Sequence, residues 1–143
     1  MKHILESENF TVCIEPQIFE ADINLPANTI LSIEVKSDGF VANTTMDIDI
    51  KDLAKFGNDL CHIYETLHGE ARLEEPYGQH MYLSFVGNGR GHIAIKGYLH
   101  KGNRIGSVQV LEFENDIDQT YLKQFCYDLL SNYENYLRST KVK

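Results

Sequence analysis

This sequence lacks long apolar runs, clustered cations and a secretory signal. No apolar run approaches the roughly 20 residues that a membrane-spanning helix requires, so no membrane partner is expected. The N-terminal residues, Met-Lys-His-Ile-Leu-Glu-Ser-Glu, contain neither the apolar segment nor the cleavage site of a signal peptide, which favours a cytoplasmic protein. Lys and Arg number 13 against 21 Asp and Glu, and the net charge of -8 argues against direct nucleic-acid binding, since phosphate contacts need clustered cations.

Cysteine is scarce as well. The chain has three cysteines, Cys13, Cys61 and Cys126, and an odd number cannot pair completely within one chain. Each of them has apolar sequence neighbours. Reduced and at least partly buried thiols therefore fit this pattern better than a disulfide framework.

The common signatures of catalysis and of metal or nucleotide binding are missing. The motifs HExxH, CxxC and GxSxG do not occur, and the six histidines do not fall at metal-ligand spacing. The glycine-rich segment 87–91 lacks the Gly-Lys-Ser/Thr ending of a phosphate-binding loop and leads into a predicted strand, so a hairpin turn is the better interpretation. We therefore expect no enzymatic activity, no cofactor and no metal.

The composition that remains is typical of one globular domain. The 143 residues are 43% hydrophobic and 24% charged, which argues against a disordered or fibrous chain. A chain of this length can bury a sizeable core, and no repeat, linker or low-complexity segment divides it. We predict a single domain over residues 1–143.

The segment from Met81 to Phe113 predicts an antiparallel meander. It reads MYLSFVGNGRGHIAIKGYLHKGNRIGSVQVLEF, three alternating runs separated by two glycine-rich turns. A three-residue loop over 88–90 sets Phe85 opposite Ile93, which pairs apolar with apolar. The predicted core face comprises Met81, Leu83, Phe85, Ile93, Ile95, Leu99, Val108, Leu111 and Phe113.

The second turn of the meander predicts an irregular register. A two-residue turn at Gly102-Asn103, continued regularly, places Ile93 opposite Glu112, which is a poor pair for a buried face. A β-bulge near Val110 instead sets Ile93 opposite Phe113. We therefore predict a bulge at that point.

The rest of the chain predicts further strands and two helices. Residues 10–19, 29–36 and 40–50 alternate as strands, the last two forming a hairpin, and residues 70–75 fit a short polar strand. Apolar residues recur at helical spacing over 51–68, where Asp49 is placed to cap the helix and Gly69 to end it, and again over 119–138. Short, hairpin-like connections predict an α+β fold: one antiparallel sheet of about six or seven strands, built from the N-terminal hairpin and the C-terminal meander, with two amphipathic helices packed on it.

Three parts of the sequence carry a resemblance to a known family. They are the first helix with its continuation, DLAKFGNDLCHIYETLHGEARLEE, the run LSFVGNGRGHIAIKGYL, and Asp118-Gln119-Thr120-Tyr121-Leu122 at the start of the last helix. Over roughly Phe10 to Leu130 the chain resembles the WapI family of immunity proteins. The resemblance implies a small cytoplasmic protein that protects a bacterium from the toxic C-terminal domain of a contact-dependent, wall-associated toxin.

The acidic charge is compatible with such a role, although solubility alone also accounts for it. A toxin domain that acts on nucleic acid is expected to have a basic cleft, and an acidic partner can be steered to that cleft and occlude it. The candidate toxin-binding acids are Asp47, Asp49, Glu74, Glu75, Glu112, Glu114 and Asp116.

Two other functions remain open at this point. The face of the middle meander strand opposite the core carries His92, Lys96, Tyr98 and His100, and a small-molecule-binding or enzymatic domain would use the His92/Tyr98/His100 face. The same exposed sheet face would alternatively build a homodimer. Eight tyrosines and no tryptophan favour an interaction surface, because tyrosine supplies rigid amphipathic contact area.

Overall fold

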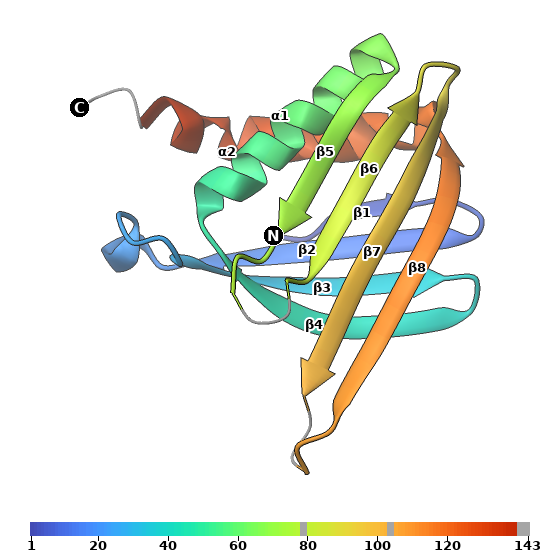
Figure 1. Ribbon diagram of the computed structural model, residues 1–143. Helices are drawn as coiled ribbons and strands as arrows, with labels where there is room; N and C mark the ends of the chain where they lie inside the picture. Colours follow the sequence, from blue (N-terminus) through green and yellow to red (C-terminus); the bar gives the residue numbers. More distant parts are fainter. Residues whose placement is uncertain (78–79, 103–104, 140–143) are drawn as a thin grey trace.

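The fold consists of two four-stranded antiparallel sheets and two α-helices (Figure 1). The computed structural model describes residues 1–77, 80–102 and 105–139. The first sheet has the order β1 (His3–Glu6), β2 (Phe10–Ile18), β3 (Thr29–Ser37) and β4 (Phe40–Ile48). The second has the order β5 (His68–Glu74), β6 (Tyr82–Asn88), β7 (His92–Gly102) and β8 (Val108–Asp118). The helices are α1 (Ile50–Thr66) and α2 (Lys123–Ser139), and three-residue 3-10 turns cover Glu20–Asp22 and Gln119–Tyr121.

The α+β class and the antiparallel pairing are confirmed, whereas the single sheet of six or seven strands is wrong. Eight strands form two sheets, and α1 lies between them in the chain. Strand β1 was missed because its four residues are too short to show a pattern by themselves. Local alternation predicts which neighbouring strands pair, but it does not say whether a helix between two groups of strands divides one sheet from another.

The two sheets form a wedge that the helices fill. The sheets approach one another where β4 meets β7 and β8, and they diverge toward β1 and β5. Helix α1 packs against β5 and α2, and α2 packs against β1, so the helices cover those two sheet edges (Figure 1). Among the described residues, no helix covers the face of the second sheet that points away from the first sheet.

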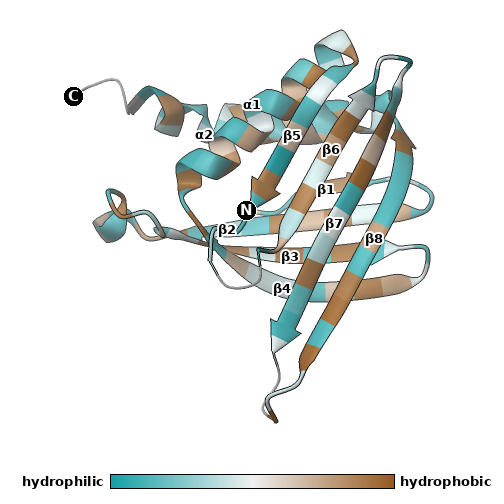
Figure 2. Cartoon of the chain, in the orientation of Figure 1, coloured by the Kyte–Doolittle hydropathy of each residue, from teal (hydrophilic) through white to brown (hydrophobic). Residues whose placement is uncertain are grey.

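One continuous hydrophobic core occupies the wedge. The inward side chains of both sheets and the facing stripes of both helices belong to a single cluster of buried residues. The rings of Phe56 on α1 and Phe85 on β6 meet edge to face, with centroids 5.7 Å apart. Figure 2 shows hydrophobic and hydrophilic residues alternating along β7, as expected of a strand with one buried face.

The first turn of the meander differs from the prediction by two residues. The loop covers 89–91, and Phe85 lies opposite Ile95, not Ile93. The side-chain oxygen of Asn88 accepts hydrogen bonds from the backbone N–H groups of Arg90 (2.7 Å) and His92 (3.2 Å), which closes the turn at this position. A shift of two residues keeps every side chain on its face, so the predicted facing survived the register error.

The second turn is longer than predicted and its register is regular. Asn103 lies outside the described residues, but Gly102 pairs with Val108 and Ile93 with Ile117, so the predicted bulge and the Ile93–Phe113 pair are wrong. Phe113 lies opposite Gly97 because its ring occupies the space that a Cβ at this glycine would need. Val108 consequently belongs to the exposed face, while Leu111 and Phe113 are half-buried and contact the core.

The helix ends follow local chemistry. Asp49 caps α1 as predicted, with Oδ1 accepting from the backbone N–H of Lys51 at 3.0 Å. Leu67, with φ 68°, ends that helix in the left-handed conformation, two residues before the predicted end at Gly69. The last helical segment begins with the 3-10 turn, which Asp118 caps through the N–H of Thr120, before α2 itself. No helix in the described part of the chain combines the length and hydropathy needed to cross a membrane.

Candidate functional site

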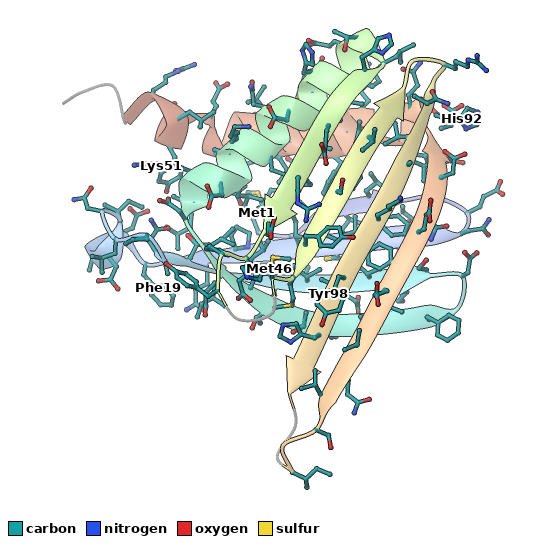
Figure 3. All side chains as sticks on the ribbon, viewed as in Figure 1. Met1, Phe19, Met46, Lys51, His92 and Tyr98 are labelled. Carbon is teal, nitrogen blue, oxygen red and sulfur yellow. The ribbon has the colours of Figure 1, made fainter. Side chains whose placement is uncertain are left out.

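The even-numbered residues of β5 to β8 form one surface, called the outer face below. Each pairing in the second sheet joins even residues with even residues, so these side chains all point away from the core. Most of them are exposed, since the helices pack elsewhere. In Figure 3, the labelled His92 and Tyr98 lie on β7 within this surface. The outer face is therefore available for contact with another molecule.

Strand β8 gives the outer face an acidic row. Glu112, Glu114, Asp116 and Asp118 alternate along the strand and are all exposed. Alternate residues of a strand lie about 7 Å apart, so the four carboxylates form an evenly spaced line. Asp116 approaches Nδ1 of His92 at 3.4 Å, whereas Glu112 and Glu114 make no ion pair with any described residue. Unpaired charge on an exposed strand is free to meet a basic partner.

Tyrosines and one further acid lie beside this row. One cross-strand rung runs from Glu74 through Tyr82 and Tyr98 to Glu112. The carboxylate of Glu74 pairs with Nε of Arg72 at 3.0 Å, and the Arg72 guanidinium lies 4.0 Å from the centre of the Tyr82 ring. The rung therefore combines flat amphipathic rings with negative charge, a combination that suits a protein interface.

The structure does not bring the other three predicted acids to the outer face. Asp49 is the α1 cap and accepts from the Asn28 side chain at 3.1 Å. Glu75 is buried and accepts a hydrogen bond from the backbone N–H of Asp47 at 2.9 Å, which ties the end of β5 to β4. The side chain of Asp47 is exposed on the first sheet. Asp49 and Glu75 therefore have structural roles within the protein, and the Asp47 side chain lies away from the outer face.

Replacing Glu75 with alanine is expected to lower the free energy of unfolding by about 1–3 kcal/mol. The backbone N–H of Asp47 would lose the buried carboxylate that accepts its hydrogen bond and links the end of β5 to β4. Urea denaturation followed by circular dichroism measures the change. Glu74→Ala is the matched control: its exposed ion pair with Arg72 is expected to contribute at most about 1 kcal/mol. Equal stability of the two variants would show that the buried carboxylate has no structural role.

The three residues of the proposed small-molecule face are not gathered around one pocket, since His92 and His100 line separate pockets. His92 and His100 share the outer face but lie eight residues apart on β7, about 27 Å along an extended strand. Of these two histidines, Tyr98 lies close to His100, with ring centroids 5.9 Å apart. The backbone carbonyl of His100 accepts from the hydroxyl of Thr44 at 2.8 Å, at the corner where β7 crosses β4. Among the described residues, no group of three or more His, Cys, Asp or Glu is placed to hold a metal ion.

A buried network at the N-terminus escaped the sequence analysis. His3 is fully buried, and its two ring nitrogens contact the carboxylate of Asp128 at 2.5 Å and the hydroxyl of Tyr133 at 2.7 Å. Burial, with the nearby Asp128 carboxylate next, raises the pKa of Tyr133 to about 12. The sequence feature that could have indicated this network is the alternation of His3 with Leu5, because it places both side chains on one face of a strand. The network joins β1 to α2, and complete burial of the His3 ring closes it to a substrate.

The cysteines are free thiols, as expected. Cys61 and Cys126 are buried where α1 packs on α2, and Cys13 is half-buried. Burial is the main cause that raises the pKa of both Cys61 and Cys126. A catalytic thiol needs the opposite shift, because the thiolate is the nucleophile. These two cysteines therefore serve packing between the helices.

Comparison with known proteins adds one finding. The model of the immunity protein WapI-like family matches residues 4–137, nearly the whole chain. A comparison with curated proteins gave no match. The matched segment includes the whole second sheet, nearly all of the first and most of α2, so it contains the complete outer face.

Proposed function

Because the chain belongs to the immunity protein WapI-like family, we propose that it binds and neutralises the toxic C-terminal domain of a contact-dependent bacterial toxin. The observation that carries the proposal to a particular surface is the uncovered acidic outer face of the second sheet. Immunity by occlusion needs a complementary surface and no catalytic group. The chain would accordingly act as a cytoplasmic inhibitor without enzymatic activity or a cofactor.

The β8 row supplies the electrostatic part of this interface. Six carboxylates and two cations belong to the outer face, the cations being Arg72 and Lys96, so the surface has a clear excess of negative charge. Opposed charges raise the rate at which two proteins meet, and clustered acids of this kind fit a basic cleft. We propose that Glu112, Glu114 and Asp116 enter the cleft with which the toxin binds its own substrate.

The Tyr82–Tyr98 pair supplies the packing part. The two rings are cross-strand neighbours at the middle of the outer face and are half-buried by the residues around them. Tyrosines near the centre of an interface often contribute much of its affinity, because they bury a large area while losing little conformational entropy. In the proposal the tyrosines determine how long the complex lasts, and the acids determine how fast it forms.

Binding to the purified toxin domain tests the function directly. The probe is a purified C-terminal toxin domain, sought first in the gene next to this one, and stopped-flow mixing measures association from about 0.05 to 0.5 M salt. Complex formation is expected to slow by about tenfold or more over this range, because salt screens exposed charges. Absence of both a complex and any loss of toxicity would refute the proposal. Binding of an uncharged small molecule, the alternative function, would scarcely respond to salt.

A further inference from the structure

Strand β4 has an unpaired backbone edge. It is the terminal strand of the first sheet and pairs only with β3 among the described strands. In an antiparallel pair, alternate residues direct both backbone groups away from the partner strand. The N–H of Asp47 points away from β3, since it donates to Glu75, so the other odd-numbered residues of β4 share that direction. Val41, Asn43 and Thr45 therefore present their N–H and C=O groups at the edge.

Helices cover two of the other sheet edges and acids line half of the third, whereas β4 is neither covered by a helix nor charged from Val41 to Met46. Helix α2 packs against β1, α1 packs against β5, and β8 has an acid at every second position of its C-terminal half. From Val41 to Met46, β4 has no charged side chain. Proteins usually guard a free edge with charge, proline or a covering element, because an open edge accepts another strand. The open edge of β4 can therefore accept a further strand.

A groove with both apolar and polar lining residues lies along the same edge. It is lined by residues 40–44 of β4, 99–101 of β7 and 109–111 of β8. The β7–β8 hairpin crosses over β4 and extends beyond it, as Figure 1 shows. Phe40, Val41 and Val110 are 68%, 58% and 51% exposed in and around the groove. An extended segment on β4 would cover apolar surface and also satisfy the open backbone groups.

We propose that the partner toxin domain adds an extended segment to β4 as a fifth strand of the first sheet, beneath the β7–β8 hairpin. This inference rests on the proposed function and names a second contact for the same complex. Among the described residues that line the groove, Lys101 is the only one with a charged side chain. The segment that fits is apolar at alternate positions and places a carboxylate near Lys101.

A second copy of this chain fits the groove poorly. The contact between the Thr44 hydroxyl and the His100 carbonyl places the β7–β8 hairpin directly on β4. Pairing two β4 strands about a two-fold axis would bring both hairpins over the same two strands. Each copy also has a net charge of -8, so the copies repel one another. A single extended segment of another protein has neither obstacle.

The Asn43→Pro and Asn43→Ala variants test the inference as a matched pair. Both lose the exposed Asn43 side chain, but only proline removes the edge N–H, which donates to none of the described strands. Titration calorimetry with the toxin domain measures affinity, and thermal unfolding checks that both variants are folded. Asn43→Pro is expected to bind at least tenfold more weakly than Asn43→Ala. Equal affinities of the two folded variants would overturn strand addition and leave the proposed function standing.

Hydrogen exchange on the unaltered protein gives a measurement that does not depend on folding of the proline variant. The backbone amides of Val41, Asn43 and Thr45 are expected to become at least tenfold more protected when the toxin domain binds. Unchanged exchange at all three in a formed complex would refute the inference. Failure of the unaltered protein to bind the toxin domain would refute the proposed function and this inference together. A dimer of the free chain that Asn43→Pro dissociates would assign the edge to a second copy and overturn the proposal.

Discussion

Replacing His3 with alanine is expected to lower the free energy of unfolding by about 3 kcal/mol, a large effect for a residue so close to the chain end. The imidazole is fully buried and contacts both Asp128 and Tyr133. Alanine would leave a cavity between β1 and α2 and would remove a partner from each of these groups. Loss of a buried polar partner costs more than the hydrogen bond itself contributes, because the remaining Tyr133 hydroxyl stays buried away from water.

Chemical denaturation of His3→Ala measures this change, and His92→Ala is its control. His92 is also a strand histidine with a nearby carboxylate, but it is exposed, so its replacement is expected to change stability by less than about 0.5 kcal/mol. Similar stabilities of the two variants would mean that the buried network does not hold β1 to α2. Because His3 is remote from the outer face, folded His3→Ala should still bind the toxin domain.

Reversing the charge of the β8 row is expected to weaken toxin binding by about 100-fold. The variant replaces Glu112, Glu114 and Asp116 with lysine, which turns an attractive row into a repulsive one opposite a basic cleft. Most of the loss should come from slower association, because exposed charges act mainly during the approach of the two proteins. Surface plasmon resonance at low and high salt separates this contribution from changes in dissociation.

The control for charge reversal places the same change of charge elsewhere. Glu6, Glu8 and Asp22 are exposed residues outside the outer face, and their replacement with lysine alters net charge equally. If binding depends only on net charge, both triple variants will weaken it to the same extent. If the β8 row is the contact, the control variant will lose less than about fivefold and will still protect cells from the toxin.

Several features could be read from local residues because the physics behind them is local. A strand or helix buries one face, so alternation and helical spacing identified both helices and most strands. Asp49 caps α1 because a carboxylate before the first turn accepts a free N–H group. The acids of β8 and the face that carries His92 and Tyr98 follow from the same two-residue period. These features need no knowledge of distant parts of the chain.

Other features depended on how distant segments meet. Strand β1 and the His3 network exist because β1 pairs with β2 and packs against α2, and His3 lies 125 residues from its partner Asp128. Tertiary packing also separated candidate acids that are neighbours in the sequence. Glu74 shares a rung with Glu112, whereas Glu75, one residue further along, is buried against β4. Sequence spacing cannot separate such neighbours, because burial here depends on the crossing of two sheets.

The register of the meander separates the features that sequence alternation predicts from those that tertiary packing determines. Alternation assigned the face of nearly every side chain, since any even shift preserves it. The Asn88 turn and the fit of the Phe113 ring over Gly97 determine which of these registers the strands adopt. The division into two sheets likewise came from packing, because α1 and α2 fill a wedge that only separate sheets can form. Facing is a property of one strand, whereas register, sheet number and open edges are properties of how strands assemble.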